Sequence, residues 1–310
     1  MKLMERENPV EEPVQTESCE PVVYSASDEE AHRNTDYTVP SGLSQMFTFY
    51  MNEMYLYTKE AGVYITLIMA FIPAIALYAY SVLLTDITDP SDYMMGMFLA
   101  LTPFMVALIA SNACAKQVNR EYKERTAYMN LALPISRISF ALGKFLSGLT
   151  LCIAFMFLAY ISTYLVATAL FGPMEGDVLG MSLAYLVMSC FMYCATSFAL
   201  GAMTTRMNVM LPFMLLFIAI PGIVMIANLA VVLTGEPMIL DIISYLYLIP
   251  TSLPDLAVKV LGYGSPLSPS GLFGFMLSGE IDGGPVLALG ALWGIAFLVL
   301  GILMIKRKDL

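Results

Sequence analysis

The segment "KFLSGLTLCIAFMFLAYISTYLVATALF", Lys144 to Phe171, contains no charged residue after its first lysine. A helix needs about 20 apolar residues to cross the hydrocarbon core of a bilayer, so this segment is long enough to span a membrane. Surface helices of soluble proteins carry a polar face, and this segment has none. The whole chain agrees, because 58% of its 310 residues are hydrophobic and only 13% are charged, against roughly 25% charged in soluble domains.

Other apolar blocks of similar length lie on both sides of this segment. The sequence therefore predicts an all-α integral membrane protein with six transmembrane helices. The predicted spans are about 61–84, 93–115, 144–171, 178–203, 209–234 and 285–305.

The segments that connect the spans divide by charge. On one side, outside the N-terminal tail, they hold eleven lysines and arginines, and on the other side only Lys259. Basic connecting segments remain in the cytoplasm. We therefore expect both termini to be cytoplasmic in a multi-pass protein of the cell membrane, with the prokaryotic plasma membrane as the expected location.

The chain divides into a tail and a membrane domain. Residues 1–36 contain ten acidic and three basic residues and show almost no apolar periodicity. Residues 1–42 are therefore predicted to form an acidic disordered cytoplasmic tail. Residues 43–310 form the predicted six-span domain.

Two shorter elements flank the spans. Residues 44–59 form an amphipathic pattern typical of a helix at the cytoplasmic surface, although a frayed extension of the first span is an alternative. Its apolar residues at helical spacing are Phe47, Tyr50, Met51, Met54 and Tyr57, while its polar residues, Thr48, Asn52, Glu53 and Lys59, fall elsewhere. Between the fifth and sixth spans, residues 235–284 favour short extracellular re-entrant helices, because a seventh span would place Lys306 outside.

The membrane domain lacks the residues of a catalytic or ion-coupled site. No acidic or basic residue is expected in the core of a span, and the sequence holds no Gly-x-x-x-x-Gly-Lys-Ser/Thr loop that could bind ATP phosphates. Cys190 and Cys194 are four residues apart, but His32, the sole histidine, lies in the tail, so we expect these cysteines to pack in the interior rather than bind a metal. Energy for active transport would have to come from a partner.

A charged stretch, "EYKERTAYMNLALPISRISFALGK" (121–144), separates the second and third spans. Glu121 and Arg125 share a helix face, and this helix should end before Pro134. Ser136 can cap a second helix that continues into the third span. On pattern alone, this stretch is either a lever that carries movement into the membrane or an ordinary basic loop.

Part of this stretch, "ERTAYMNLALPISRISFALGK" (124–144), resembles the second cytoplasmic segment of type-two ABC exporter permeases. In that family a Glu, a Thr, a Leu-x-x-Pro-x-Ser-Arg run and a Gly-Lys occur in this order. The helix before the first span, the short extracellular helices and the "IKRKDL" ending (305–310) also agree. The family commonly has glycine where this chain has Arg125.

The resemblance implies a permease subunit with no ATP-binding site of its own, no cofactor in this chain and no catalytic residue. ATP and Mg are expected on a partner ATP-binding subunit, and the other expected partners are a second permease copy or sister permease and the lipid bilayer, with no nucleic acid. The coupling helix maps to about 121–132 and the elbow helix to about 44–59. The predicted coupling segment contains Glu121, Tyr122, Glu124, Arg125, Thr126, Leu131, Leu133, Pro134, Ser136 and Arg137.

We expect export of a small amphiphilic substrate, namely a drug, a lipid or a peptide, because the spans are uncharged and no large outer domain is present. The alternatives are an energy-independent channel, a secondary transporter and a membrane scaffold without an ATPase partner. A membrane-embedded enzyme is a further class, but it would require a catalytic constellation that the sequence does not contain.

Overall fold

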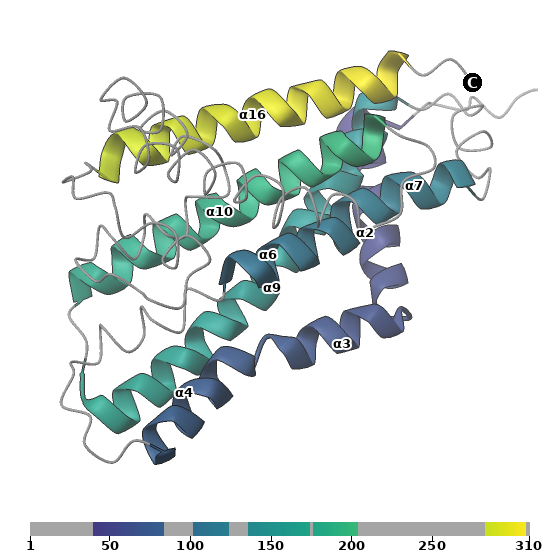
Figure 1. Cartoon of the computed structure of the whole chain (residues 1–310). Coiled ribbons are helices and arrows are strands. Elements are labelled where there is room, and N and C mark those ends of the chain that lie inside the picture. Colours follow the sequence, from purple (N-terminus) through teal and green to yellow (C-terminus); the bar gives the residue numbers. More distant parts are fainter. Residues whose placement is uncertain (1–39, 84–101, 124–135, 174–175, 204–282, 308–310) are drawn as a thin grey trace, which may run out of the picture. The chain divides into compact units, whose positions relative to one another are not determined.

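The computed structural model describes residues 40–83, 102–123, 136–173, 176–203 and 283–307. Every regular element within these ranges is helical (Figure 1). The elements are α2 (Gly42–Tyr57), α3 (Ala61–Met69), α4 (Ile72–Leu83), α6 (Thr102–Ala110), the π-helix η1 (Ser111–Ala115), α7 (Lys116–Lys123), α9 (Arg137–Phe171), α10 (Gly176–Met203) and α16 (Gly283–Arg307).

Helices α9 and α10 form the centre of the packing. Helix α9 contacts α2, α4, α6, η1, α10 and α16, and α10 contacts α6, η1, α7 and α16 as well. The buried side chains of these helices form one hydrophobic cluster. Because α9 and α10 touch almost every other described element, a movement of either one affects the packing of the rest.

Four helical segments in the described ranges are long and apolar enough to cross a membrane: Ala61–Leu83, Arg137–Phe171, Ser182–Met203 and Leu287–Arg307. They correspond to the first, third, fourth and sixth predicted spans. The second predicted span, 93–115, is described from Thr102 onward, where α6, η1 and α7 succeed one another directly. The fifth predicted span, the segment 235–284 up to residue 282 and the tail up to residue 39 lie outside the described residues.

The first span is interrupted between α3 and α4. Pro73 has no N–H to donate, and its ring clashes with the carbonyl group four residues earlier, at Met69. The α-helix accordingly ends at Met69, and α4 begins at Ile72. The Ala70 N–H still bonds to Thr66 at 3.1 Å and to Leu67 at 3.3 Å, so the chain continues through this break in a tightened turn.

The residues at the two ends of α9 explain where this helix begins and where it ends. The predicted cap at Ser136 is confirmed, because its hydroxyl group accepts a bond from the Ser139 N–H at 3.4 Å. At the other end Gly172 adopts a φ of 99°, a conformation that side chains with a Cβ rarely take, and its N–H bonds to Thr168. The helix therefore starts seven residues before the predicted span at Lys144.

The π-helix η1 fits between α9 and α10 because glycines face it. A Cβ atom at Gly148 of α9 would lie 2.6 Å from the Cys114 sulfur, and one at Gly201 of α10 would lie 2.8 Å from the Cα atom of Ala115. Small residues allow helix backbones to approach closely in membranes, where packing rather than the hydrophobic effect drives association. These glycines thus set the spacing of the three central elements.

Helices α10 and α16 run parallel. A Cβ atom at Gly294 would clash with the Phe191 ring, and a Cβ atom at Gly301 would clash with the Phe198 ring. Both pairs are seven residues apart and advance in the same direction. Parallel fourth and sixth spans are the arrangement that a six-span protein requires.

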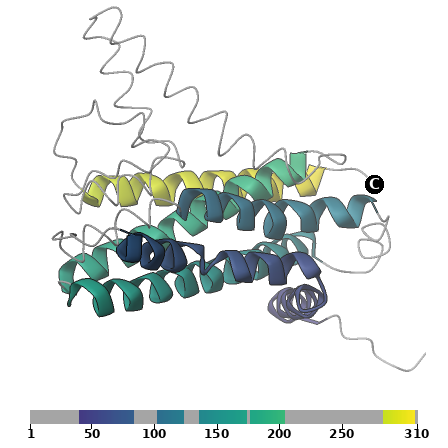
Figure 2. The ribbon, with the colours of Figure 1, turned by 60° about the horizontal axis from the view of Figure 1, so that its bottom comes forward.

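Helix α2 lies across the long helices rather than along them (Figures 1 and 2). Its exposed apolar side chains recur every fourth residue, at Leu43, Phe47, Met51 and Tyr55. A second stripe, offset by two residues, is turned toward the protein and includes the buried Gln45, Glu53 and Tyr57. The predicted helix is present, but its residues divide differently, because Tyr57, which was grouped with the apolar residues, shares the buried face with Gln45 and Glu53.

We predict that Gly201→Ala destabilises the protein by about 1–3 kcal/mol, because the new methyl group would press on the backbone of Ala115, which cannot rotate away. Thermal unfolding of the purified protein in detergent measures the effect. The matched control is Gly180→Ala in the same helix, where a Cβ atom meets nothing within 4 Å. That variant should be neutral or more stable. Equal melting temperatures for the two variants would contradict the close approach of α10 to η1.

Candidate functional site

The structure places the two ends of the predicted coupling segment on different helices. Glu121 and Tyr122 lie in the last turn of α7, Ser136 is the N-cap of α9, and Arg137 is its first residue. The other predicted residues lie outside the described part of the chain: Glu124, Arg125, Thr126, Leu131, Leu133 and Pro134.

The start of α9 is fastened to α2. The Gln45 side chain bonds at both of its ends, since its oxygen accepts from the Ser136 N–H at 3.0 Å and its nitrogen donates to the Pro40 carbonyl at 2.9 Å. Two turns further along α9, Gly143 allows the α2 backbone to approach, because a Cβ atom there would lie 2.7 Å from the Met46 oxygen. The beginning of α9 and the middle of α2 are therefore in direct backbone contact.

The start of α9 is also fastened to α16. Arg137 Nη1 donates a hydrogen bond to the Lys306 carbonyl oxygen at 3.0 Å. Lys306 lies in the last turn of α16, where carbonyl groups have no partner within the helix and the helix dipole is negative. A predicted coupling residue therefore holds the end of the last span.

Six charged side chains from four neighbouring segments form a connected ion network, which has three carboxylates and three cationic groups. Lys144 bonds to Glu53 and, at 2.8 Å, to Glu121, while Arg120 bonds to Glu53 at 3.1 Å and to Glu60 at 2.6 Å. Lys116 completes the network with a 2.8 Å bond to Glu60. The members are Glu53 of α2, Glu60 before α3, Lys116, Arg120 and Glu121 of α7, and Lys144 of α9.

Burial makes this network different from surface ion pairs. The Lys144 side chain is 0% exposed and that of Glu53 is 2% exposed, whereas Lys116 at the edge of the network is 41% exposed. An isolated buried charge is strongly unfavourable, and removing one member of a buried pair leaves the other uncompensated. The buried pair Lys144–Glu53 therefore holds its position firmly, whereas the partly exposed pair Lys116–Glu60 contributes little to stability.

A layer of neutral hydrogen bonds lies next to the ion network. Tyr57 Oη donates to the Ala113 carbonyl of η1 at 3.0 Å, and the Gln117 amide group bonds to both the Tyr57 and Ser147 hydroxyl groups. Burial, together with the smaller electrostatic effects of Cys114 and Glu53, raises the pKa of Tyr57 well above its usual value. The Tyr57 hydroxyl therefore remains protonated and keeps its role as a donor.

Sequence reasoning grouped Glu53 with the polar residues of a surface helix and did not predict its burial. Glu53 and Lys144 are 91 residues apart, and nothing local joins them. One signal was present, since Gln45, Glu53 and Tyr57 recur at multiples of four and lie opposite the apolar stripe of α2. The helix predicted to run from the Ser136 cap into the third span is confirmed, and Lys144 lies within it, but its burial and its ion pairs were not predicted.

The network joins several helices. Among the described residues it has three carboxylates and three cations, and in the same ranges no group of three or more His, Cys, Asp or Glu side chains is arranged to hold a metal ion. Its ion pairs connect α2, α7, α9 and the residue before α3. They therefore help to hold these elements in position relative to one another.

The family described as "ABC-2 family transporter protein" matches residues 11–310, which is nearly the whole chain. The chain belongs to this family. No curated protein matches it. Members are the membrane permease subunits of ABC transporters, which usually lack an ATP-binding domain and associate with a separate ATP-binding subunit.

Membership of the ABC-2 family agrees with the described structure. A multi-pass permease requires several spans, and four candidate spans lie in the described residues. The family favours the permease over the channel, secondary-transporter and scaffold alternatives. The match also extends into the predicted acidic tail as far as residue 11.

We predict that Lys144→Met destabilises this ABC-2 permease by about 3–5 kcal/mol, since methionine fills a similar volume but leaves two carboxylates without their shared cation. Chemical unfolding in detergent measures the loss. Lys116→Met is the matched control and should cost at most about 1 kcal/mol, because its ammonium group is partly solvated.

The double variant Lys144→Met/Glu53→Gln distinguishes a lost ion pair from a packing defect. In Lys144→Met the Glu53 carboxylate keeps only its bond to Arg120, so removing its charge as well should recover part of the loss, giving a coupling energy of about 0.5–3 kcal/mol. Strictly additive losses would contradict the inner ion pair.

Proposed function

We propose that this permease exports a small amphiphilic substrate, and that movement of its ATP-binding partner enters the membrane domain through the joint between α2, α7 and α9. The observation that carries this proposal is the 2.8 Å bond between Glu121 and Lys144. Glu121 lies at the end of α7, where the predicted coupling helix begins, and Lys144 is anchored inside α9. A push on the coupling segment would therefore reach the third span directly.

The length of α9 supports a lever. Its 35 residues correspond to roughly 52 Å of helix, which is longer than the ~30 Å hydrocarbon core of a bilayer. Part of α9 must then extend beyond the core or tilt within it. The ion network and the Ser136 cap lie at the first turns, so these turns are the natural place for a partner outside the bilayer to act.

The bond from Arg137 to the end of α16 extends the same joint to the last span. Because α16 also packs along α10, tilting of α9 would be accompanied by movement of α10 and α16. Rigid-body movement of packed helices is a common form of switching between two states. We propose that such a movement opens a path at the interface between two permease copies, or between this chain and a sister permease.

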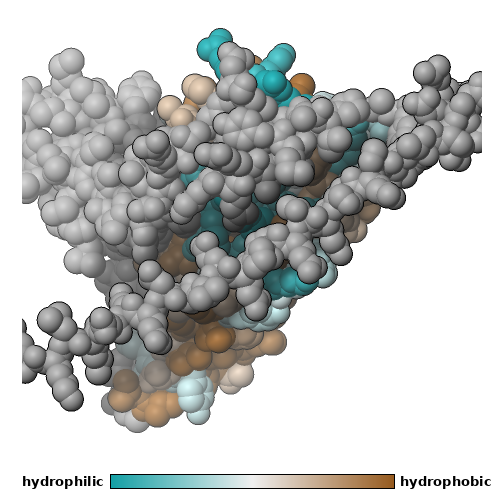
Figure 3. Space-filling view, turned by 90° about the vertical axis from the view of Figure 1, so that its right-hand side faces the viewer, coloured by the Kyte–Doolittle hydropathy of each residue, from teal (hydrophilic) through white to brown (hydrophobic). Residues whose placement is uncertain are grey.

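The surface of α2 to α4 supports a position in the lipid. Four large apolar side chains are exposed on α2, and α3 and α4 also carry exposed apolar side chains, among them Ile65, Ile68, Ile75 and Val82. Figure 3 shows hydrophobic surface on the lower part of the face nearest α2. We propose that α2 lies as an elbow helix at the cytoplasmic surface of the bilayer, with its apolar stripe in the lipid.

The distribution of charge supports both the orientation and the class of substrate. Within the four candidate spans, charged residues occur only at Arg137, Lys144, Lys306 and Arg307, which all lie toward one end of the bundle. We propose that this end is cytoplasmic, as basic residues favour. The uncharged remainder is better suited to an amphiphilic drug, lipid or peptide than to a bare ion.

The proposed function makes two predictions, of which the first concerns the ATP-binding partner. A C-terminally tagged protein extracted in mild detergent should co-purify with a stoichiometric ATP-binding subunit identified by mass spectrometry, and the eluate should hydrolyse ATP. Alteration of residues 121–137 should release that subunit. A partner-free oligomer without ATPase activity would reject the proposed mode of energy supply.

The second prediction concerns coupling. Charge reversal at Glu124 and at Arg137 should leave the protein in the membrane but separate ATP hydrolysis from transport, because the first contact with the partner and the link to α16 would each be lost. Transport by reconstituted vesicles, measured beside ATPase activity, provides the test. Lys59→Glu is the control, since Lys59 is exposed and lies outside the segment. Normal transport in both reversal variants would refute the coupling assignment.

A further inference from the structure

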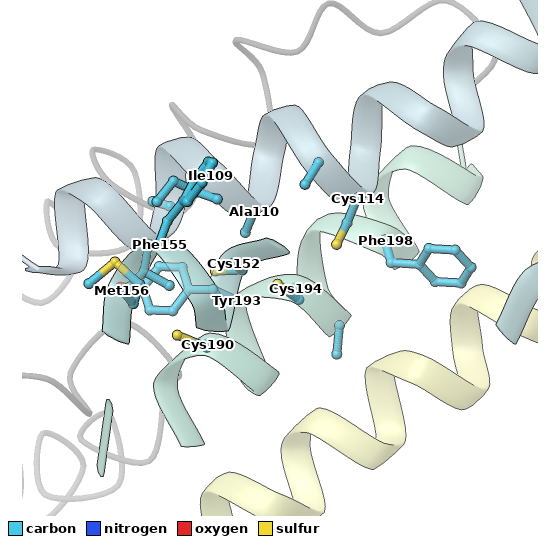
Figure 4. Close-up of a cluster of buried hydrophobic side chains, with 14 of the residues drawn as sticks. Ile109, Ala110, Cys114, Cys152, Phe155, Met156, Cys190, Tyr193, Cys194 and Phe198 are labelled. Carbon is cyan, nitrogen blue, oxygen red and sulfur yellow. The ribbon is translucent and has the colours of Figure 1, made fainter. Parts of the chain in front are cut away.

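Four cysteines from three helical elements gather in the interior, and the proposed transport mechanism uses none of them. They are Cys114 of η1, Cys152 of α9, and Cys190 and Cys194 of α10. All four are free thiols with at most 1% of their surface exposed. Figure 4 shows their side chains directed toward a common region between the three elements.

Cys152 is the shared member of this thiol cluster. Its thiol lies beside those of Cys190 and Cys194, and Cys194 lies beside Cys114 in turn (Figure 4). Because Cys190 and Cys194 are one helical turn apart on α10, both can reach the same sulfur on α9. Gly148 allows Cys114 to approach from the other side, since a side chain there would occupy the position of its sulfur.

The surroundings favour a neutral product over a bound metal ion. Thiols bind metals as thiolates, and several negative sulfurs would be unfavourable among apolar neighbours such as Phe155, Met156 and Ile109. In the described part of the chain, no set of three or more potential ligands is arranged for a metal. A disulfide, by contrast, is uncharged and apolar, so it can form in this environment without a compensating cation.

We propose that the cluster is a redox modification site in which Cys152 forms a disulfide with Cys190 or Cys194. One S–S bond forms and two S–H bonds break, and the two protons and two electrons pass to a quinone, which becomes a hydroquinone. A lipid-soluble oxidant of this kind can enter the membrane domain, and it would reach these thiols when α9 and α10 move apart, since the thiols have at most 1% of their surface exposed.

The position of the disulfide defines its effect. A bond from Cys152 to either partner joins α9 covalently to α10, the two helices at the centre of the packing. The oxidised protein would have these two helices fixed, and reduction would release them.

The test uses the full-length protein in membrane vesicles, oxidised with decylubiquinone as the probe. Free thiols are then blocked with N-ethylmaleimide, and the denatured protein is cut by a glutamyl endopeptidase. Glu175 lies between Cys152 and Cys190 in the sequence, so cleavage there separates their peptides. The two peptides should remain linked without reductant and separate when it is added.

Cysteine variants identify the pair. Cys152→Ser should abolish the link, and so should Cys190→Ser/Cys194→Ser, whereas either single change on α10 should retain it. Cys114→Ser and the tail variant Cys19→Ser are controls that should also keep it. Cys152→Ala is a second variant for the case that serine prevents membrane insertion.

Two results would overturn the proposal. One is complete separation of the wild-type peptides without reductant, both in vesicles and in detergent, where the oxidant has free access. The other is a link that persists when Cys152 is replaced. Neither readout depends on transport or on an ATP-binding partner, so the outcome is independent of the proposed function.

Discussion

A lysine with no exposed surface governs the architecture at one end of this protein. Lys144 lies inside a long helix, and its ammonium group reaches solvent from no direction. The free energy of burying such a charge is prohibitive unless carboxylates surround it. Glu53 and Glu121 supply them, and each comes from a different helix. The requirement for charge balance at this one atom therefore draws three helices together.

Helix α2 is shaped by the same requirement. An ordinary amphipathic helix at a soluble surface buries its apolar side and exposes its polar side. In α2 the buried stripe includes Gln45 and Glu53, and the exposed stripe includes Phe47 and Met51. This reversed arrangement is stable only if the protein interior offers polar partners and lipid covers the outer face. The ion network provides the partners, and in the proposed elbow position the bilayer would provide the lipid.

The interior beyond the network is organised by close contact instead of charge. Gly148 and Gly201 let η1 come near α9 and α10, and Gly294 and Gly301 receive aromatic rings of α10. The same close approach brings Cys114 toward the cysteines of the neighbouring helices. Helix α9 contacts both α10 and α16, and the proposed mechanism uses these contacts to carry a displacement of its first turns to the other spans.

The sequence by itself determined the membrane class, the approximate bounds of the four spans that the structure describes, and the cap at Ser136. These features are local, since apolar length, hydroxyl caps and proline act within a few residues. The interruption of the first span before Pro73 was not predicted. Only the tertiary structure decided that Glu53 pairs with Lys144, that Arg137 holds the end of α16, and that Cys152 meets two thiols of α10. Helical periodicity identifies which side chains share a face, but it carries no information about which distant helix that face will meet.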